Sequence, residues 1–466
     1  KATDAENGED GRDEDDDDEN DSDDARMKEN EERFKAEQDR FLMEADAAGI
    51  RDRAEYAIRV CAPPGDLLGP SFVDGLRRDD LDAVVRIMTN GAGETRTAAK
   101  DTSTARIVGV HGFGGVGKSC FAQQVCGKVD VVRSAFRKGG MYWLTLTDEA
   151  TLVREMRKLL HDLLAMHVPL ADAKKESNEC PDATTARQAI RSVLTGRWLS
   201  SDRAPVLVVL DDVWDGTLVA KTLPIDALPA GSVVLMTYRD ERVGSDAGVT
   251  HDRELTTLTE AASLKLLRKA CGAGVALPRA AALEVARRVG YHPMALNIVG
   301  RDVATLATDE GDRSLVTSPR LWKETLEGLN EDVGDLCSDE KEKVDGAENA
   351  RRYASVFASI ALSFRRLKGK AKRRGRHRGF DAAFLIEAYR KLAIFGASAR
   401  VPVMALTRVW ALKTSTETKA CAGIFVQAGL MERRVEAGGE VLTYRLHDLC
   451  RDYVRWRVEK EGGVDV

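Results

Sequence analysis

The sequence lacks any apolar run long enough to cross a membrane, which excludes the helical membrane-protein class. Val206–Leu210 is typical of its longest apolar stretches, whereas a spanning helix needs about 18 consecutive apolar residues. No secretory signal is visible, although the sequence starts at Lys1 and its natural beginning is open. We therefore expect no membrane partner.

Paired cysteines and internal repeats are lacking as well. The eight cysteines are scattered along the chain without a C-x-x-C pair. This spacing argues against a zinc site or a disulfide framework and for a reducing compartment. We therefore expect a cytoplasmic protein.

Charge is distributed unevenly. Residues 1–24 contain 14 Asp and Glu against Lys1 and Arg12, a local net charge of −12, so the remainder carries +6. Such a block cannot bury a core, and we expect a disordered acidic tail. The composition leaves two roles open for this tail: it binds a basic partner, or it is only solvated. Residues 25–62 are expected to form a charged helical or linker segment.

The most informative motif is Gly112–Ser119, which fits G-x-x-x-x-G-K-[ST] at every defined position. A β-branched run at 106–111 precedes it, and apolar residues at helical spacing follow it. Glycines let the backbone wrap around phosphate, and the following helix directs its free N–H groups there. The residues expected to bind the nucleotide are Gly112, Gly114, Gly115, Val116, Gly117, Lys118, Ser119 and Cys120.

Two further strands end in charged residues. Val206–Leu210 runs into Asp211 and Asp212, as required of a strand that positions Mg²⁺ and an attacking water. Val233–Met236 leads to Arg239, whose guanidinium could distinguish a triphosphate from a diphosphate. Strands alternating with helices predict a parallel sheet covered on both faces.

The order of these motifs resembles the NB-ARC nucleotide-binding switches of plant disease-resistance proteins and apoptotic protease-activating factors. The matching segments are Gly112–Ser119, Leu210–Trp214, Gly231–Arg239, Leu255–Leu258, Gly290–Leu296, Leu392–Phe395 and Leu446–Leu449. The resemblance covers roughly residues 63–460 and implies three parts: an α/β P-loop domain with a parallel sheet, a helical domain and a winged-helix domain. The expected boundaries are 63–250 for the P-loop domain, 251–330 for the helical ARC domain, 331–349 for a linker and 350–466 for the winged helix.

The resemblance also implies roles at the phosphate end of the site. Lys118 would bind phosphate, and Ser119 and Asp211 would hold Mg²⁺. Asp212 would be the base that orients water, and Arg239 would sense the γ-phosphate. These roles together imply a slow ATPase.

At the other end, Val73 and Pro293 would border the adenine, and His447 would contact the β-phosphate of ADP. Spacing alone favours a His447 that caps the following helix, whereas the family context favours the phosphate contact. The chain departs from the family at Asp74 and Gly75, at Tyr238, which replaces a Thr, at Leu446, which replaces a Met, and at Tyr291–His292, which replaces the usual Leu.

The function implied is a signalling switch that is closed with ADP, active and self-associating with ATP, and reset by hydrolysis. Sensor and effector modules are expected beyond both ends of the chain. An alternative is a nucleic-acid-binding regulator that uses the winged helix and the basic run 365–378, which could also direct nuclear import. A solvated loop is the plainer interpretation of that run. An ordinary P-loop ATPase or kinase is a third option, which the Leu446–Leu449 element disfavours.

Overall fold

The computed structural model describes residues 73–89, 105–128, 132, 134–136, 139–196, 204–272, 274–338, 353–373, 379–396, 399–435 and 442–460. The expected acidic tail 1–24, the segment 25–62 and the last part of the basic run, 374–378, lie outside these described residues. Nowhere in the described ranges does a helix have both the length and the apolar character needed to cross a bilayer.

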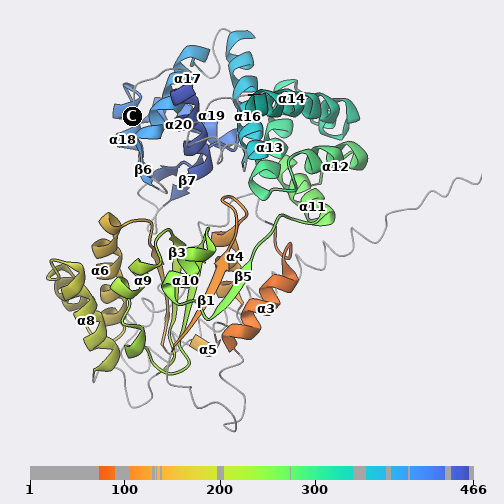
Figure 1. Cartoon of the computed structure of the whole chain (residues 1–466). Coiled ribbons are helices and arrows are strands. Elements are labelled where there is room, and N and C mark those ends of the chain that lie inside the picture. Colours follow the sequence, from red (N-terminus) through yellow and green to blue (C-terminus); the bar gives the residue numbers. More distant parts are fainter. Residues whose placement is uncertain are drawn as a thin grey trace, which may run out of the picture.

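The first half of the described chain is built on a five-stranded sheet (Figure 1). Its strands are β1 (Arg106–His111), β2 (Met141–Thr145), β3 (Leu207–Val213), β4 (Val233–Tyr238) and β5 (His251–Glu254). The order across the sheet is β2-β3-β4-β1-β5, and every recorded pairing is parallel. The carboxyl ends of the strands therefore meet at one edge, the position at which open α/β sheets bind ligands.

Helices cover both faces of this sheet, as the unbroken apolar runs of its strands require. Val208 and Leu210 of β3 enter one core, and Leu207 and Val209 enter the other, because successive strand side chains point to opposite faces. The first face carries α6 (Glu149–Ala165), α7 (Leu170–Asn178), α8 (Ala183–Thr195), α9 (Thr217–Thr222), η2 (Ile225–Ala227) and α10 (Glu241–Ala247). The second carries α3 (Arg78–Thr89), α4 (Lys118–Gly127) and α5 (Ser134–Phe136). In Figure 1, α6 and α8 lie on the opposite flank of the sheet from α3.

A set of helices follows the sheet. They are α11 (Glu260–Cys271), α12 (Arg279–Arg288), α13 (Pro293–Asp309), η3 (Arg313–Thr317) and α14 (Pro319–Ser338). Pro278 caps the start of α12, and Pro293 occupies the first turn of α13. Gly290, at φ 65°, makes the turn between them. These positions are favourable because proline lacks an N–H that a helix start leaves unpaired, and glycine tolerates positive φ.

The last part of the chain combines helices with a small sheet. Its elements are α16 (Ala354–Arg373), α17 (Ala382–Arg390), η5 (Lys391–Ile394), β6 (Arg400–Pro402), α18 (Val403–Val409), α19 (Ser415–Gln427), β7 (Glu432–Val435), β8 (Leu442–Arg445) and α20 (Asp448–Lys460). The strands form an antiparallel sheet in the order β6-β8-β7. One hydrophobic core runs from Leu267 of α11 through Phe357 to Tyr453 of α20, so the helical and carboxyl-terminal parts are packed together.

The structure corrects two expectations. The linker expected at 331–349 is helical at its start, since α14 continues to Ser338. Buried Leu329 and an ion pair between Glu331 and Arg365 hold that helix against α16. The domain boundary expected at residue 250 would exclude β5 from the P-loop domain. The four residues of β5 are all exposed, but the strand pairs with β1 and so belongs to the same sheet. An edge strand of polar residues carries no apolar signal, because its conformation comes from backbone hydrogen bonds to its neighbour.

Candidate nucleotide-binding site

The loop sequence lies between β1, which ends at His111, and α4, which begins at Lys118. Gly112 (φ 143°) and Gly117 (φ 97°) have backbone conformations that favour glycine. A Cβ atom on Gly112 would lie 2.5 Å from the carbonyl oxygen of Leu255, so a larger residue would force the chain apart. The free N–H groups and positive dipole end of α4 then adjoin the loop, an arrangement that binds phosphate.

Lys118 is buried and folds back over the loop. Its Nζ donates hydrogen bonds to the carbonyl oxygens of Gly112 (2.9 Å) and Phe113 (3.0 Å). Burial, reinforced by the nearby Arg239 guanidinium, lowers the pKa of Lys118 to about 8. The carboxylates of Asp212, Asp211 and Asp448 oppose this shift, and phosphate oxygens beside Lys118 would oppose it further.

Asp211 joins the loop to the sheet. Its Oδ1 accepts hydrogen bonds from Ser119 Oγ (2.8 Å) and Thr237 Oγ1 (2.6 Å). Burial raises the pKa of Asp211, so a cation beside it would favour its ionised form. A hydroxyl and a carboxylate this close provide the oxygen ligands that Mg²⁺ takes alongside nucleotide phosphates. Ser119 and Asp211 therefore fit the metal role expected of them.

Asp212 has a strained backbone, with φ 55° at a residue that is not glycine. Its N–H donates to Thr237 Oγ1 (2.9 Å), and the pairing of β3 with β4 shifts register between Leu210 and Val213. Strain of this kind costs about 1–3 kcal/mol and commonly marks functional positions. It turns the Asp212 carboxylate toward the edge of the sheet, 3.8 Å from Arg239.

Arg239 links the sheet to the carboxyl-terminal part of the chain. Its Nη2 lies 2.5 Å from Oδ2 of Asp448, the first residue of α20, across 209 positions of sequence. The guanidinium also lies over the ring of Trp214, 4.9 Å from its centroid, and Trp214 is 41% exposed. Asp448 is buried and Arg239 is partly exposed, and their ion pair holds α20 against the carboxyl edge of the sheet.

His447 lies directly before α20 and caps it. Its Nδ1 accepts a hydrogen bond from the N–H of Leu449 (3.2 Å). Burial lowers the pKa of His447, with Asp448 opposing the shift. The neutral ring therefore carries its proton on Nε2, which remains a donor for an anion. The capping interpretation is confirmed, and it is compatible with a phosphate contact by the other nitrogen.

Gly114, at the tip of the loop, is contacted from three separate helices. Its N–H points at the Tyr353 hydroxyl at the start of α16 (3.4 Å), and its carbonyl oxygen is 2.9 Å from His292 Nε2. Leu449 Cδ2 would lie 3.3 Å from a Cβ atom placed on Gly114. The helical and carboxyl-terminal parts therefore both close over the phosphate loop.

His292 is a site residue that the sequence interpretation passed over. A carbonyl oxygen can only accept, so Nε2 must donate to Gly114, and buried Nδ1 is left as an acceptor with no hydrogen-bond partner in the described residues. Burial, together with nearby positive groups, lowers the pKa of His292 to about 4. The sequence signal was its departure from the family's Leu, which alone did not reveal a contact with the loop.

The residues expected at the adenine end both lie outside the sheet. Val73 packs on the core that the helical and carboxyl-terminal parts share, and Pro293 starts α13 next to His292. Arg77 reaches from the segment after Val73 to the carbonyl oxygens of Val116 (3.2 Å) and Thr256 (2.5 Å). Arg77 is a second residue that the motifs did not predict.

Three other positions are settled by their surroundings. Val116 is buried in the core under the sheet, so it serves the site through its backbone. Cys120 is half-buried in the first turn of α4. Tyr238 is fully buried and donates to Asp252 Oδ1 (2.7 Å), away from the strand ends, so Thr237 is the residue of this strand that serves the site.

Comparisons with known proteins show which sequences this chain resembles. Residues 96–275 match the NB-ARC domain family. Disease resistance protein RFL1 of Arabidopsis thaliana is 23% identical over 258 residues, covering 54% of this chain and 27% of that protein. Regulatory protein AfsR of Streptomyces coelicolor is 30% identical over 404 residues, covering 84% of this chain and 34% of that protein. The chain spans about a quarter of the length of the Arabidopsis relatives that it matches.

Solved structures show a more distant likeness. A STAND protein with a tetratricopeptide repeat sensor from Pyrococcus horikoshii is 14% identical with a TM-score of 0.40, covering 79% of this chain and 44% of that one. The ORC2 protein of Aeropyrum pernix is 13% identical with a TM-score of 0.41, covering 85% of this chain and 98% of that one.

Proposed function

Because residues 96–275 form an NB-ARC domain, we propose that this protein is a signalling switch whose state depends on the adenine nucleotide it holds. ADP favours the closed form, ATP favours the active form, and slow hydrolysis returns the switch to ADP. The observation that carries the proposal is the ion pair between Arg239 and Asp448, which fastens α20 to the carboxyl edge of the sheet.

In the closed form, the diphosphate is held from two sides. Lys118 and the start of α4 bind it from the sheet. His447 donates its Nε2 proton from the start of α20, since its Nδ1 is occupied by the N–H of Leu449. The contacts of Tyr353 and Leu449 with Gly114 support this arrangement, because they close the carboxyl-terminal part over the loop.

ATP would compete for the cation that keeps the switch closed. The Arg239 guanidinium can pair with Asp448 or with a γ-phosphate, and a bidentate phosphate contact is the stronger partner. Shifting a two-state balance from 1:99 to 99:1 needs about 5.5 kcal/mol of differential binding. Charge-assisted hydrogen bonds contribute about 1.5–3 kcal/mol each, so two or three exchanged contacts are sufficient.

Hydrolysis would use the residues at the ends of β3 and β4. Ser119 and Asp211 would hold Mg²⁺, which neutralises charge on the phosphates, and Asp212 would orient the attacking water. The carboxylate of Asp212 lies 3.8 Å from Arg239, so its alignment with water depends on where that guanidinium is engaged. This dependence supports a slow reaction that follows the state of the switch.

We further propose that the carboxyl-terminal part contains a winged helix. Its element order is α17, β6, α18, α19, β7, β8, and its sheet order is β6-β8-β7. This arrangement supports that assignment because a three-helix unit is followed by a two-stranded wing that pairs back onto the first strand.

The nucleic-acid alternative gains no support from α19, the helix that would enter a groove in such a protein. Its charged residues are one Lys, Lys419, and one Glu, Glu417. Sequence-independent binding to phosphates depends on clustered Lys and Arg, and this helix offers no excess of positive charge. We therefore favour the switch.

The relatives suggest which part of the mechanism is shared. A plant protein named for disease resistance and a bacterial regulatory protein both match this region, although their names differ. We infer that the common part is nucleotide switching, and that sensing, effector recruitment and ATP-dependent self-association depend on the remainder of each protein.

The test is to identify the bound nucleotide. Purified protein should release stoichiometric ADP on denaturation, measured by ion-exchange chromatography. Lys118→Ala should abolish nucleotide retention, whereas Lys128→Ala, at the exposed far end of the same helix, should not. Retention of nucleotide by the Lys118 variant would refute the assignment of the phosphate loop.

A further inference from the structure

The connector between β5 and α11, residues 255–259, carries the chain from the sheet to the helical part. Leu255 is buried in the core on the face of the sheet that α3 and α4 cover, whereas Leu258 is buried in the core that the helical and carboxyl-terminal parts share. Thr256 and Thr257, which lie between them, are exposed. A change in the orientation of the helical part relative to the sheet would therefore bend the chain at these two residues.

Both ends of the connector are bonded to neighbouring backbone. The N–H of Leu255 donates to the carbonyl oxygen of His111 (2.7 Å), and the Leu255 carbonyl oxygen would lie 2.5 Å from a Cβ atom placed on Gly112. The N–H of Leu258 donates to the carbonyl oxygen of Tyr291 (3.0 Å), in the turn before α13. The connector therefore contacts the first residue of the phosphate loop at one end and the helical part at the other.

Arg77 links the middle of this connector to the phosphate loop. Its Nη2 donates hydrogen bonds to the carbonyl oxygens of Thr256 (2.5 Å) and Val116 (3.2 Å), which are 179 and 39 positions away in the sequence. The Arg77 side chain is 10% exposed, so few water molecules can replace these acceptors. Hydrogen bonds from a charged donor are roughly twice as strong as those between neutral groups. A single guanidinium thus joins a carbonyl group of the loop to a carbonyl group of the connector.

Two contacts fix the position of Arg77. Its carbonyl oxygen accepts a hydrogen bond from the N–H of Leu81 (2.9 Å), in the first turn of α3. Its Nη1 lies 3.8 Å from Oδ2 of Asp80, and Oδ1 of Asp80 accepts a hydrogen bond from Nε of Arg253 (2.8 Å). Arg253 belongs to β5, the strand that leads into the connector. Asp80 therefore holds Arg77 beside the connector.

The bond to Val116 sets the direction of a backbone group in the phosphate loop. In a planar trans peptide, the C=O group and the following N–H group point in opposite directions. Because the Val116 carbonyl is turned toward Arg77, the N–H of Gly117 is turned away from it. Backbone N–H groups of such loops are the groups that bind phosphate oxygens. Arg77 therefore constrains a peptide that a bound phosphate would constrain from its other side.

We propose that Arg77 is a positioning residue that couples the phosphate loop to the connector, so that phosphate in the loop restrains the orientation of the helical part. This inference rests on the proposed nucleotide site. A phosphate bonded to the N–H of Gly117 would hold the peptide that carries the Val116 carbonyl, and Arg77 would pass that restraint to Thr256. Without nucleotide the loop peptide can rotate, and the connector loses the restraint.

The experiment is amide hydrogen exchange of the whole chain, resolved to single residues by electron-transfer fragmentation and measured with and without saturating ADP and Mg²⁺. In the parent chain, ADP should slow exchange at Gly117 and at Leu258 by at least about tenfold each. In Arg77→Met, ADP should still slow exchange at Gly117 but should change exchange at Leu258 by less than about twofold. The amide of Leu255 should respond to ADP alike in both proteins, because its hydrogen bond to His111 does not involve Arg77. A general loss of stability would speed exchange at all three amides, so it would not remove the response of Leu258 alone.

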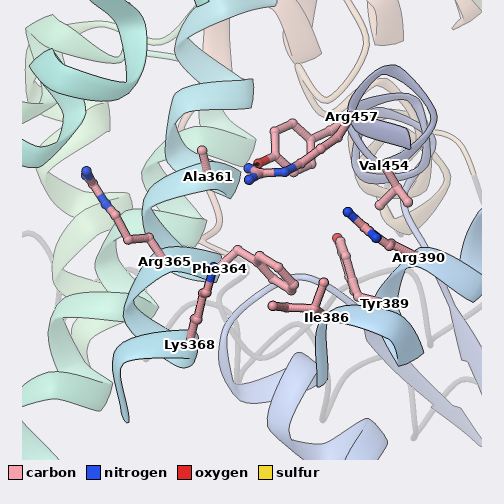
Figure 2. Close-up of a pocket in the computed structure, with 10 residues that line it drawn as sticks. Ala361, Phe364, Arg365, Lys368, Ile386, Tyr389, Arg390, Val454 and Arg457 are labelled. Atoms are coloured by element: carbon pink, nitrogen blue, oxygen red, sulfur yellow. Dashed lines mark hydrogen bonds between the residues drawn. The ribbon is translucent and has the colours of Figure 1, made fainter. Parts of the chain in front are cut away.

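Two variants of other cations are matched controls. Arg86, also on α3, donates to the carbonyl oxygen of Asp82 in its own helix (3.2 Å). Lys368, on α16, lines a cavity of about 340 Å³ between α16, α17 and α20, and the residues that line it include none from the loop or the connector (Figure 2). Arg86→Met and Lys368→Met should both keep the parent response of Leu258 to ADP.

Arg77→Gln, whose shorter side chain carries no charge, should behave as Arg77→Met does and replaces it if that variant does not fold. Full protection of Leu258 by ADP in the folded Arg77 variant, or loss of that protection in either control, would overturn the coupling. So would a parent chain in which ADP protects Gly117 but not Leu258, although nucleotide binding itself would then stand. A parent chain that ADP does not protect at Gly117 would refute the proposed function as well.

Discussion

Replacing Asp448 with Asn tests the closed form most directly. The substitution keeps the size of the side chain but removes the charge that pairs with Arg239 at 2.5 Å. Breaking a fully buried pair costs about 3–5 kcal/mol. Here the Arg239 side chain is 25% exposed and Asp212 remains 3.8 Å away, so the loss should be smaller. We estimate about 2 kcal/mol, or roughly a thirtyfold shift toward the open form.

The assay is stopped-flow release of a fluorescent ADP analogue chased with unlabelled ADP. If release requires opening, Asp448→Asn should release the analogue roughly thirtyfold faster. Asp452→Asn is the matched control, because Asp452 is on the same helix but pairs only with its neighbour Arg451 (2.9 Å) in the ion pairs described. It should release the analogue at the parent rate.

A double-mutant cycle separates the ion pair from other effects of the substitution. Asp448 is in the first turn of α20, so its charge also interacts with the helix dipole, worth about 0.3–1 kcal/mol. That contribution persists in an Arg239→Gln background, whereas the pairing energy does not. If the free-energy effects of Asp448→Asn and Arg239→Gln add within about 0.5 kcal/mol in the double variant, the reasoning is refuted, since contacting residues that stabilise one state must be coupled.

Three other outcomes are expected. Binding of ADP just above pH 8 should be accompanied by uptake of a proton, because phosphate would raise the pKa of Lys118 from its lowered value of about 8. Calorimetry in buffers of different ionisation enthalpy measures the number of protons taken up. An uptake of zero would contradict the prediction. The pKa of His292, lowered from 6.5 to about 4, means that its contribution to stability is full above pH 6.5 and is lost as pH falls toward 4. Acidification from pH 7 to pH 4.5 should therefore lower the unfolding free energy of His292→Leu by about 2–3 kcal/mol less than it lowers that of the parent chain. Urea unfolding at both pH values measures this difference. The same pH dependence in both proteins would count against a buried neutral ring. Ser119→Ala should bind ADP but lose the gain in affinity that Mg²⁺ provides, and a variant that keeps the full gain would remove Ser119 from the metal site.

Much of the α/β part could be predicted because its signals are local. The strands β1, β3 and β4 are short apolar runs buried on both faces, and the loop after β1 has fixed glycine positions. In α3, the apolar face of Leu81, Val84, Val85 and Met88 is buried as its helical spacing predicts. The strand β5 was not predicted from the sequence, because its residues are polar and exposed and its conformation depends on pairing with β1.

The sequence by itself determined the chemistry of the phosphate site. Glycines at the required turns and a lysine at the start of α4 lie together in Gly112–Ser119, so local backbone geometry is enough to build the phosphate loop. Asp211 is 92 positions from Ser119, but the apolar strand that ends in it has its own local signal, so its place at the carboxyl edge of a parallel sheet could be predicted as well.

Only the tertiary structure decided what covers that site. The partnership of Arg239 with Asp448 spans 209 positions, and His292 reaches Gly114 across 178. Contacts at such separations depend on how whole helices pack around the shared core, and nothing in the local sequence of either partner specifies the other.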